Sequence, residues 1–414
     1  MYTTVKGLNI LKRLLRYSDK IFNLRALVKS VGDKRQRRQI AMEWIFAAGL
    51  VMAMGQLGSL NALEQAQGVV YWRRWVGGKK VSADAMGYGF ARTDCDSIRA
   101  MIRQVYSQLK RNKALKPIRA GMIALAIDGH ESHCSQKQCC GGCLKRTHKA
   151  KGNQKERTEY YHRHVMASLI FDGICLPLDM EPQKPGEDEG RCARRLLERI
   201  LKNYPRAFDL ILADGLYARA PFFKLAIKHG KDVIAVLKDD RRDLLKDARG
   251  LFRKEKSTVY QEGKVRKECW DIEEFRSWDQ LDYPVRVVCS RETRRIKRQK
   301  TKEIKEQVSE WVWVSTIPKR KLETENFIKF AHDRWKIENN TFHEMVNYWH
   351  TDHVYKHDPV AIEAFGLTGM LAYILFHAFI GRNLKEVFRE KHTKKGLARM
   401  ITADLYLCKK FIPP

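Results

Sequence analysis

The chain has 414 residues, which is long enough for two or three domains with buried cores. Lysine and arginine total 79 against 48 for aspartate and glutamate, so the formal net charge is +31, and such a field attracts polyanions, nucleic acid before anionic membrane. The ten cysteines, four of them crowded into one loop, argue against a disulfide framework and for a reducing compartment with metal or free thiols.

Two apolar segments, residues 44–60 and 364–381, are candidates for membrane spans. A spanning helix needs about 20 largely apolar residues. The first segment is short and contains Gln56, and the second contains Thr368 and His377. We therefore predict that both are buried core helices and that the protein has no membrane partner. The N-terminal residues show no signal-peptide pattern, so we expect a cytoplasmic location.

Residues 1–115 are predicted to form a basic, all-α, DNA-binding domain. Apolar residues recur at helical spacing, and residues 96–110 have the pattern of a capped amphipathic helix. Residues 71–80 combine aromatic rings with cations that include Arg73 and Arg74. Such a loop can hold a DNA backbone or an unstacked base, and the alternative is a tryptophan-anchored linker between domains.

Over residues 119–237 the pattern changes to alternating strands and helices. The dipeptide Asp172-Gly173 lies between two apolar runs and is a strong hairpin signal. The expected strands are 122–128, 164–171, 174–180, 210–213 and 232–237, and the expected helices are 187–204 and 221–229. The order β-β-β-α-β-α-β is that of the RNase H-like fold, an α/β fold with a mixed sheet flanked by helices.

A highly charged region follows at residues 238–318. Two β-like stretches, 285–289 and 311–316, flank a basic run at 291–305 that includes Arg294 and Arg295. We interpret the region as a β-rich insertion with a mobile or DNA-contacting basic arm. Residues 319–414 are expected to supply the final helices of the core and the C-terminal region.

Three acidic residues occupy the positions that an RNase H-type nuclease requires. Asp128 ends the first predicted strand, Asp214 follows the fourth, and Glu338 lies in a segment with a helical pattern. Two strand tips and one helix face can bring three carboxylates together around divalent metal. Carboxylate oxygens suit Mg²⁺ or Mn²⁺, and two such ions about 3.5–4 Å apart support phosphodiester cleavage. We predict that these three acids are catalytic.

The segments around the acids resemble the DDE transposases of bacterial insertion sequences, in the subgroup with a β-rich insertion before the final Glu. The residues that carry the resemblance are Ala-Ile-Asp-Gly at 126–129, Leu-Ala-Asp-Gly-Leu-Tyr at 212–217 and Arg-Trp-Lys-Ile-Glu-Asn at 334–339. The resemblance covers about residues 119–380. Residues 1–115 are similar to the family only in being helical, basic and N-terminal.

The third motif matches the family in part. Its Arg stands four residues before the Glu, but the auxiliary Tyr and Lys that the family often has are Ala331 and Met345 here. His343 or Lys336 could take their place.

The resemblance implies a role for each residue of the motifs. Asp128, Asp214 and Glu338 would hold two Mg²⁺ or Mn²⁺ ions. Arg334, one helical turn before Glu338, would contact a DNA phosphate, orient Glu338 through a salt bridge, or both. Lys336 would contact DNA. The implied partners are double-stranded DNA, both inverted-repeat ends and target, and a second copy of the chain when DNA is bound, in the nucleoid of a bacterial cell.

A cysteine-rich loop follows the first acid. Four cysteines fall within ten residues, and Zn²⁺ prefers four sulfur or nitrogen ligands in a tetrahedron. The candidate ligands are Cys134, Cys139 or Cys140, Cys143, and His148 or His133. The alternative is a reduced loop of free thiols. Because Lys145 and Arg146 make the loop basic, it is also a candidate DNA contact with or without structural zinc.

The function predicted from these features is that of a DNA transposase, which binds element ends, cuts them and joins the 3′ ends to target DNA. Three alternatives stay open: an RNase H-fold DNA endonuclease of repair or defence, a non-catalytic domesticated DNA-binding relative, and a membrane-associated basic protein. The intact acidic set argues against the second, and the basic N-terminal helices argue against a minimal nuclease.

Overall fold

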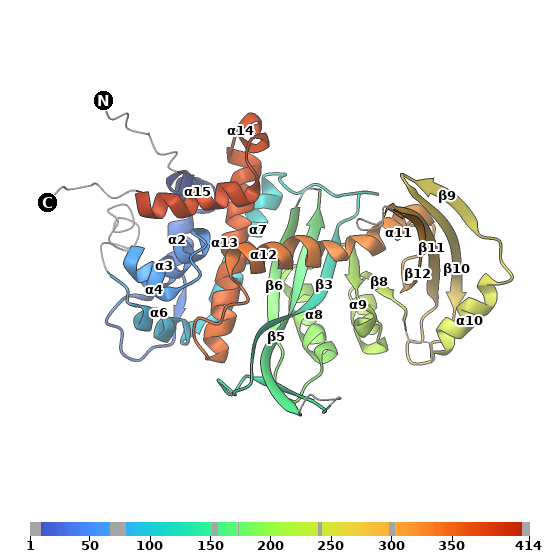
Figure 1. Ribbon diagram of the computed structural model, residues 1–414, viewed down its shortest axis with the longest axis horizontal. Helices are drawn as coiled ribbons and strands as arrows, with labels where there is room; N and C mark the ends of the chain where they lie inside the picture. Colours follow the sequence, from blue (N-terminus) through green and yellow to red (C-terminus); the bar gives the residue numbers. More distant parts are fainter. Residues whose placement is uncertain are drawn as a thin grey trace.

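The computed structural model describes residues 10–66, 80–150, 156–172, 174–238, 242–297 and 303–407. A helical region, a central sheet and a second β-rich region follow one another along the long axis (Figure 1). The elements of the helical region are α1 Ile10–Phe22, α2 Leu24–Lys29, β1 Gly32–Asp33, α3 Met42–Met54, α4 Leu60–Ala66, α6 Ala83–Phe90, β2 Thr93–Asp94 and α7 Cys95–Arg111. The predicted helix at 96–110 is thus confirmed as α7, while residues 71–79, with Arg73 and Arg74, lie outside the described residues.

The central sheet has the strand order β6-β5-β3-β7-β8. Strand β5 runs antiparallel to both β3 and β6, and β7 and β8 run parallel to β3. Helices α8, α9 and the short 3₁₀ turn η1 connect the later strands. The bounds are β3 Ala124–Ser135, β5 Arg157–Phe171, β6 Ile174–Pro182, α8 Glu189–Asn203, β7 Leu210–Ala213, η1 Gly215–Tyr217, α9 Ala220–Lys228 and β8 Asp232–Val236. The RNase H-like order predicted from the sequence is confirmed.

Strand β3 is longer than predicted. The apolar run ends at Asp128, but β3 continues to pair with β5 from Asp128↔Met166 to Ser135↔Tyr160. Backbone hydrogen bonds carry the strand beyond the core, where its side chains become polar, so the hydrophobic pattern did not show the extension. Strand β4, Leu144–His148, pairs with the outer part of β5. The predicted turn at Asp172-Gly173 is only partly described, because Gly173 lies outside the described residues.

The insertion consists of α10 Asp243–Phe252 and four antiparallel strands, β9 Thr258–Glu262, β10 Val265–Phe275, β11 Val285–Lys297 and β12 Ile304–Ser315. Its β-rich character is as predicted, but two features differ. The described part of the basic run 291–305 belongs to strands β11 and β12, which pair from Arg286↔Ser315 to Lys297↔Ile304. In addition, β12 pairs with β8, so the insertion extends the central sheet.

The C-terminal region holds α11 Thr324–Asp333, the π-helical turn η2 Ile337–Phe342, α12 His343–Trp349, α13 Pro359–Asn383, α14 Glu386–Glu390 and α15 Lys394–Leu407. By length and composition α13 alone among the described helices could cross a membrane, and 83% of its apolar window is buried inside the protein. It runs between the N-terminal helices and β6 (Figure 1). The two apolar segments are therefore buried helices, α3 and α13, as predicted.

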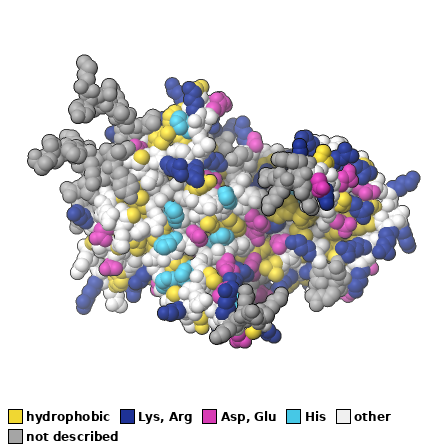
Figure 2. All heavy atoms as spheres, viewed as in Figure 1, with side chains coloured by type: hydrophobic (Ala, Val, Ile, Leu, Met, Phe, Trp, Pro, Cys, Tyr) yellow, Lys and Arg dark blue, Asp and Glu magenta, His cyan; other side chains and the backbone are white. Residues whose placement is uncertain are grey.

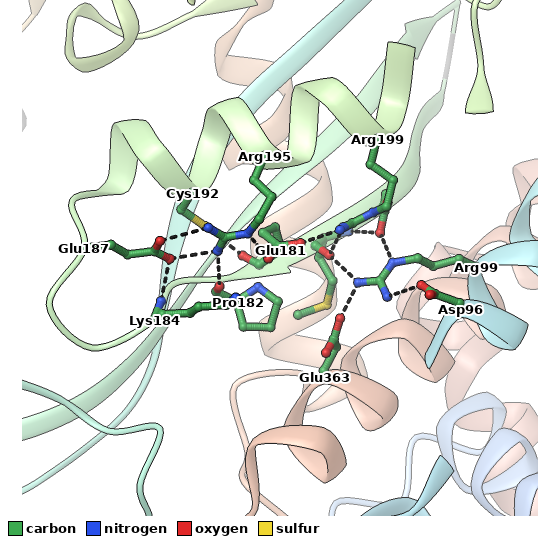
Figure 3. Close-up of polar contacts among 12 residues, drawn as sticks. Asp96, Arg99, Glu181, Pro182, Lys184, Glu187, Cys192, Arg195, Arg199 and Glu363 are labelled. Carbon is green, nitrogen blue, oxygen red and sulfur yellow. Dashed lines mark hydrogen bonds and ion pairs between the residues drawn. The ribbon is translucent and has the colours of Figure 1, made fainter. Parts of the chain in front are cut away.

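A buried ionic network joins the helical region to the central sheet (Figure 3). Arg99 of α7 donates from Nε to Asp179 Oδ1 of β6 at 2.9 Å, and it also contacts Glu363 of α13. Arg199 of α8 donates from Nε to the second oxygen of Asp179 at 2.6 Å. Asp179 is only 2% exposed, so its charge depends on these two guanidinium groups. The network fixes α7, α8 and α13 around one strand.

Replacing Arg99 by Met should lower the free energy of unfolding by about 3 kcal/mol, because loss of one partner leaves buried carboxylates incompletely paired. The matched control is Arg103→Met, one turn along α7, where the exposed guanidinium donates to Asn203 Oδ1. There the cost should stay below about 1 kcal/mol. Urea unfolding of both variants measures the difference. Equal losses would show that the network does not hold the two regions together.

Candidate active site

Asp128 and Asp214 lie side by side at one edge of the central sheet. In the parallel pair β3–β7, Ile127 is the partner of Ala213, and the next residue on each chain is an aspartate. Adjacent strands are about 4.8 Å apart, so the register places the two aspartates next to each other. Asp214 stands between the end of β7 and the turn η1.

Glu338 reaches the same place from the helices that cross the sheet. It lies in the π-helical turn η2, and such turns often occur at functional sites. Arg334 Nη1 donates to Asp128 Oδ2 at 2.8 Å and to Glu338 Oε1 at 2.7 Å. The neighbouring Trp335 packs edge-on against Trp311 of β12, with ring centroids 4.8 Å apart. The inserted strands thus support the segment that carries Arg334 and Glu338.

The three carboxyl groups differ in their electrostatic surroundings. Burial raises the pKa of Asp128 well above its usual range, and the contact with Glu338 adds to the rise. Burial also acts to raise the pKa of Glu338, but hydrogen bonds with Asp128 and Arg334 outweigh it and leave that pKa lowered. Burial opposes ionisation of Asp214 too, yet a backbone N–H and the charges of Lys238 and Arg334 lower its pKa. Of the three carboxyl groups, Asp128 is therefore the one whose surroundings favour the protonated form.

Two residues at this site were not foreseen from the sequence. Lys238 Nζ donates to Asp214 Oδ1 at 3.2 Å. A signal for it existed, because Lys238 follows β8, and β7 and β8 are parallel neighbours that end at the same edge of the sheet. Glu189, at the start of α8, approaches the backbone beside Asp128 so closely that a Cβ built on Gly129 would lie 2.4 Å from its Oε1. A larger residue after this aspartate would require the Glu189 side chain to move.

The acids suit divalent metal by their chemistry, although they are not fully gathered here. Carboxylate oxygens are the ligands that Mg²⁺ prefers, and negative charges this close together repel each other when no cation lies between them. The three acids do not form a group whose ligand atoms all lie within 4.8 Å of one another. Arg334 lies between Asp128 and Glu338, and Lys238 pairs with Asp214. The two basic side chains occupy the place where bound cations would neutralise the acids.

The basic residues predicted to contact DNA differ in their exposure and in whether acidic side chains already pair with them. Lys145 and Arg294 are exposed. Arg295 pairs with Glu306 at 3.3 Å, and Lys336 pairs with Asp333 at 2.8 Å. Arg146 is the most constrained, because its guanidinium pairs with two carboxylates and stacks on a ring. Its partners are Glu131 at 2.8 Å, Glu159 at 2.8 Å and the Tyr161 ring at 4.6 Å.

The cysteine-rich loop is folded against the outer part of β5, where it forms two groups of candidate metal ligands. One group is Cys140, Cys143 and His162, and the other is His133, Cys139 and His357. Two ligands suggested by the sequence lie in neither group. Cys134 Sγ is 3.9 Å from a guanidinium nitrogen of Arg146, and His148 pairs with Glu159 at 2.9 Å. The strand β4 carries His148 away from the thiols.

Histidine side chains gather near the middle of one face, over the region of α12 and α13, with acidic side chains beside them over the strands (Figure 2). Burial lowers the pKa of His162 to about 4, so its imidazole is neutral at pH 7, as a metal ligand must be.

A family model described as Transposase DDE domain matches residues 119–375. This range begins before β3 and ends within α13, so it includes all three acids and the whole insertion. No curated protein matches the chain.

Replacing Arg334 by Gln should destabilise the metal-free protein by about 2 kcal/mol, since charge-assisted hydrogen bonds to two carboxylates are lost. Mg²⁺ should then raise the melting temperature of the variant more than that of the parent, because the unpaired acids gain more from a cation. Lys336→Gln, two residues further along and paired with Asp333, is the control. An equal Mg²⁺ effect in all three proteins would separate Arg334 from the metal site.

Proposed function

Because the chain belongs to the transposase DDE domain family, we propose that it is a DNA transposase that binds the ends of its element, cleaves phosphodiester bonds there and joins the 3′ ends to target DNA. The observation that carries this proposal is the meeting of Asp128 and Asp214 on adjacent parallel strands with Glu338, which Arg334 ties to Asp128.

Asp128, Asp214 and Glu338 are proposed to hold two Mg²⁺ or Mn²⁺ ions, which when bound activate the attacking oxygen and stabilise the leaving oxygen. The chain's own side chains prepare the site. Arg334 keeps Glu338 directed at Asp128, and with its charge it can also meet a phosphate oxygen of DNA. Lys238 balances the charge of Asp214 until a cation arrives.

DNA binding is proposed to rest on the basic surface around this site. The net charge of the whole chain, +31, favours association with a polyanion. Exposed Lys145 and Arg294, at opposite sides of the acids along the sheet, are proposed phosphate contacts, together with Arg295 and the loop that carries Arg73 and Arg74. We further propose that two copies act together on paired element ends, at the nucleoid.

Asp128→Asn, Asp214→Asn and Glu338→Gln should each reduce Mg²⁺-dependent cleavage by on the order of 10³-fold or more, because each amide keeps the shape of the side chain but loses a charge that holds metal. DNA binding should be nearly unchanged. Glu198→Gln, an exposed acid on α8, is the matched control and should cleave normally. Normal cleavage by any of the three site variants would remove that residue from the site.

The substrate for this assay is DNA from both flanks of the coding region, tested with supercoiled plasmid as target. Joined products with the 3′ ends of the flank covalently linked to plasmid support a transposase. Cleavage without joining under the same conditions would favour an RNase H-fold endonuclease of repair or defence. Binding without cleavage by the parent protein would favour a non-catalytic relative.

Binding to duplex DNA should weaken steeply with salt. A protein that neutralises several phosphates releases counterions, which gives a log–log slope of roughly −0.9 per phosphate contact. Fluorescence anisotropy with a labelled duplex between about 50 and 200 mM salt measures this slope. The double variant Lys145→Ala, Arg294→Ala should lower the magnitude of the slope by about 1.8, the value for two phosphate contacts. A flat dependence would contradict the proposal that the basic surface holds DNA.

A further inference from the structure

We propose that Cys140, Cys143 and His162 bind a structural Zn²⁺ ion that fastens the loop between β3 and β4 to strand β5. The three ligand atoms already lie close together: Cys140 Sγ is 3.8 Å from Cys143 Sγ and 3.5 Å from His162 Nε2, and Cys143 Sγ is 3.6 Å from His162 Nε2. This site is separate from the acidic one and does not depend on the DNA chemistry.

These distances are the edges of a zinc tetrahedron. Bonds of about 2.3 Å to sulfur and about 2.0–2.1 Å to nitrogen place two ligand sulfurs about 3.8 Å apart, and a sulfur and a nitrogen about 3.5 Å apart. The observed separations agree with both values. Hydrogen bonding alone does not require such an equal triangle of soft ligands. Sulfur and imidazole ligands select zinc over Mg²⁺, which prefers oxygen.

The local backbone is arranged around these ligands. Cys140 and Cys143 are the ends of a Cys-Gly-Gly-Cys turn, closed by a hydrogen bond from Cys143 N to Cys140 O at 3.3 Å. The amide of Cys140 also points at Cys143 Sγ, at 3.4 Å. Cys143 and His162 are buried, with 6% and 8% exposure, so water does not compete strongly for their ligand atoms.

The adjoining group of His133, Cys139 and His357 provides the fourth ligand or holds a second ion. The rings of His133 and His162 have centroids 6.4 Å apart, and those of His133 and His357 are 4.7 Å apart. His133 lies in a β-bulge of β3 with a φ of 52°, a conformation that turns its ring out of the regular alternation of the strand. Two histidines from distant parts of the chain thus face the thiol turn.

The ligands connect elements that are far apart in sequence. His162 belongs to β5, the cysteines to the loop after β3, and His357 to the segment that precedes α13. The loop already approaches α13 closely, since a Cβ built on Gly142 would lie 2.9 Å from Pro359 Cγ. His162 is four residues along β5 from Met166, the partner of Asp128, or about 13 Å at 3.3 Å per residue. The ion would therefore be structural, and with His357 as a ligand of this ion or of a second one beside it, the metal centre would set where α13 begins relative to the central sheet.

Elemental analysis of the full-length protein, purified with reductant and washed with Mg²⁺ to clear the acidic site, should find about one zinc per chain, or two if the second group also fills. Cys140→Ser, Cys143→Ser and His162→Ala should each lose at least one zinc. The matched controls are Cys134→Ser and His148→Ala, whose side chains lie outside both groups and which should keep the full content.

Because Cys143 is buried, its variant could fail to fold, so X-ray absorption of zinc in the parent protein gives an independent measurement. Two sulfur neighbours with nitrogen completing the shell are expected. Removal of zinc by chelator should also speed amide exchange several-fold at 139–143 and 355–358. Three results would overturn the proposal. The first is that removing zinc leaves the melting temperature of the parent protein unchanged, and the second is that X-ray absorption finds only oxygen neighbours around zinc. The third is that His162→Ala keeps the full zinc content.

Discussion

Helix α13 has to be buried, and the rest of the structure is built around that requirement. Its 25 residues are apolar on nearly all sides, so one neighbour cannot cover it. Helices α1, α3 and α7 pack on it from the N-terminal region, and strand β6 packs on it from the central sheet. Burial of apolar surface stabilises the folded chain by about 25 cal/mol per Å², so covering α13 holds the N-terminal helices and the central sheet together in one core. The ionic network around Asp179 then fixes the orientation of the packed elements, since each guanidinium has to meet a buried carboxylate.

At the acidic site, repulsion among three carboxyl groups is opposed by the positive charges of two basic side chains. The strand register forces Asp128 beside Asp214, and the crossing helices bring Glu338 to the same edge. Neighbouring carboxylates repel each other, and the chain relieves the repulsion with Arg334 and Lys238, while the partial burial of Asp128 raises its pKa and so favours its protonation. A bound divalent cation would take over the neutralisation that these groups provide. On the proposed function, the site should therefore gain stability when metal binds.

Much of this arrangement follows from the sequence, and the failures have identifiable physical causes. Strand β7 has the predicted bounds because its four residues are apolar and buried, and Asp214 follows as expected. The extension of β3 was missed because its outer residues are polar, and the pairing of β12 with β8 was missed because register between distant strands leaves no local pattern. His162 and His357 were not connected to the cysteines for the same reason, while Cys134 and His148 were favoured by proximity in sequence alone. Arg146 pairs with acids that only the folded hairpin brings near.

The central claim is that one metal site is formed by Asp128, Asp214 and Glu338. Anomalous diffraction from crystals of the protein with duplex DNA and Mn²⁺ tests it most directly. We predict two peaks about 3.5–4 Å apart, bound by all three carboxylates, with Arg334 still contacting Glu338 or moved to a phosphate. The account would be contradicted if manganese bound elsewhere in the protein. It would also be contradicted if each ion bound only one of these acids while the three side chains stayed apart.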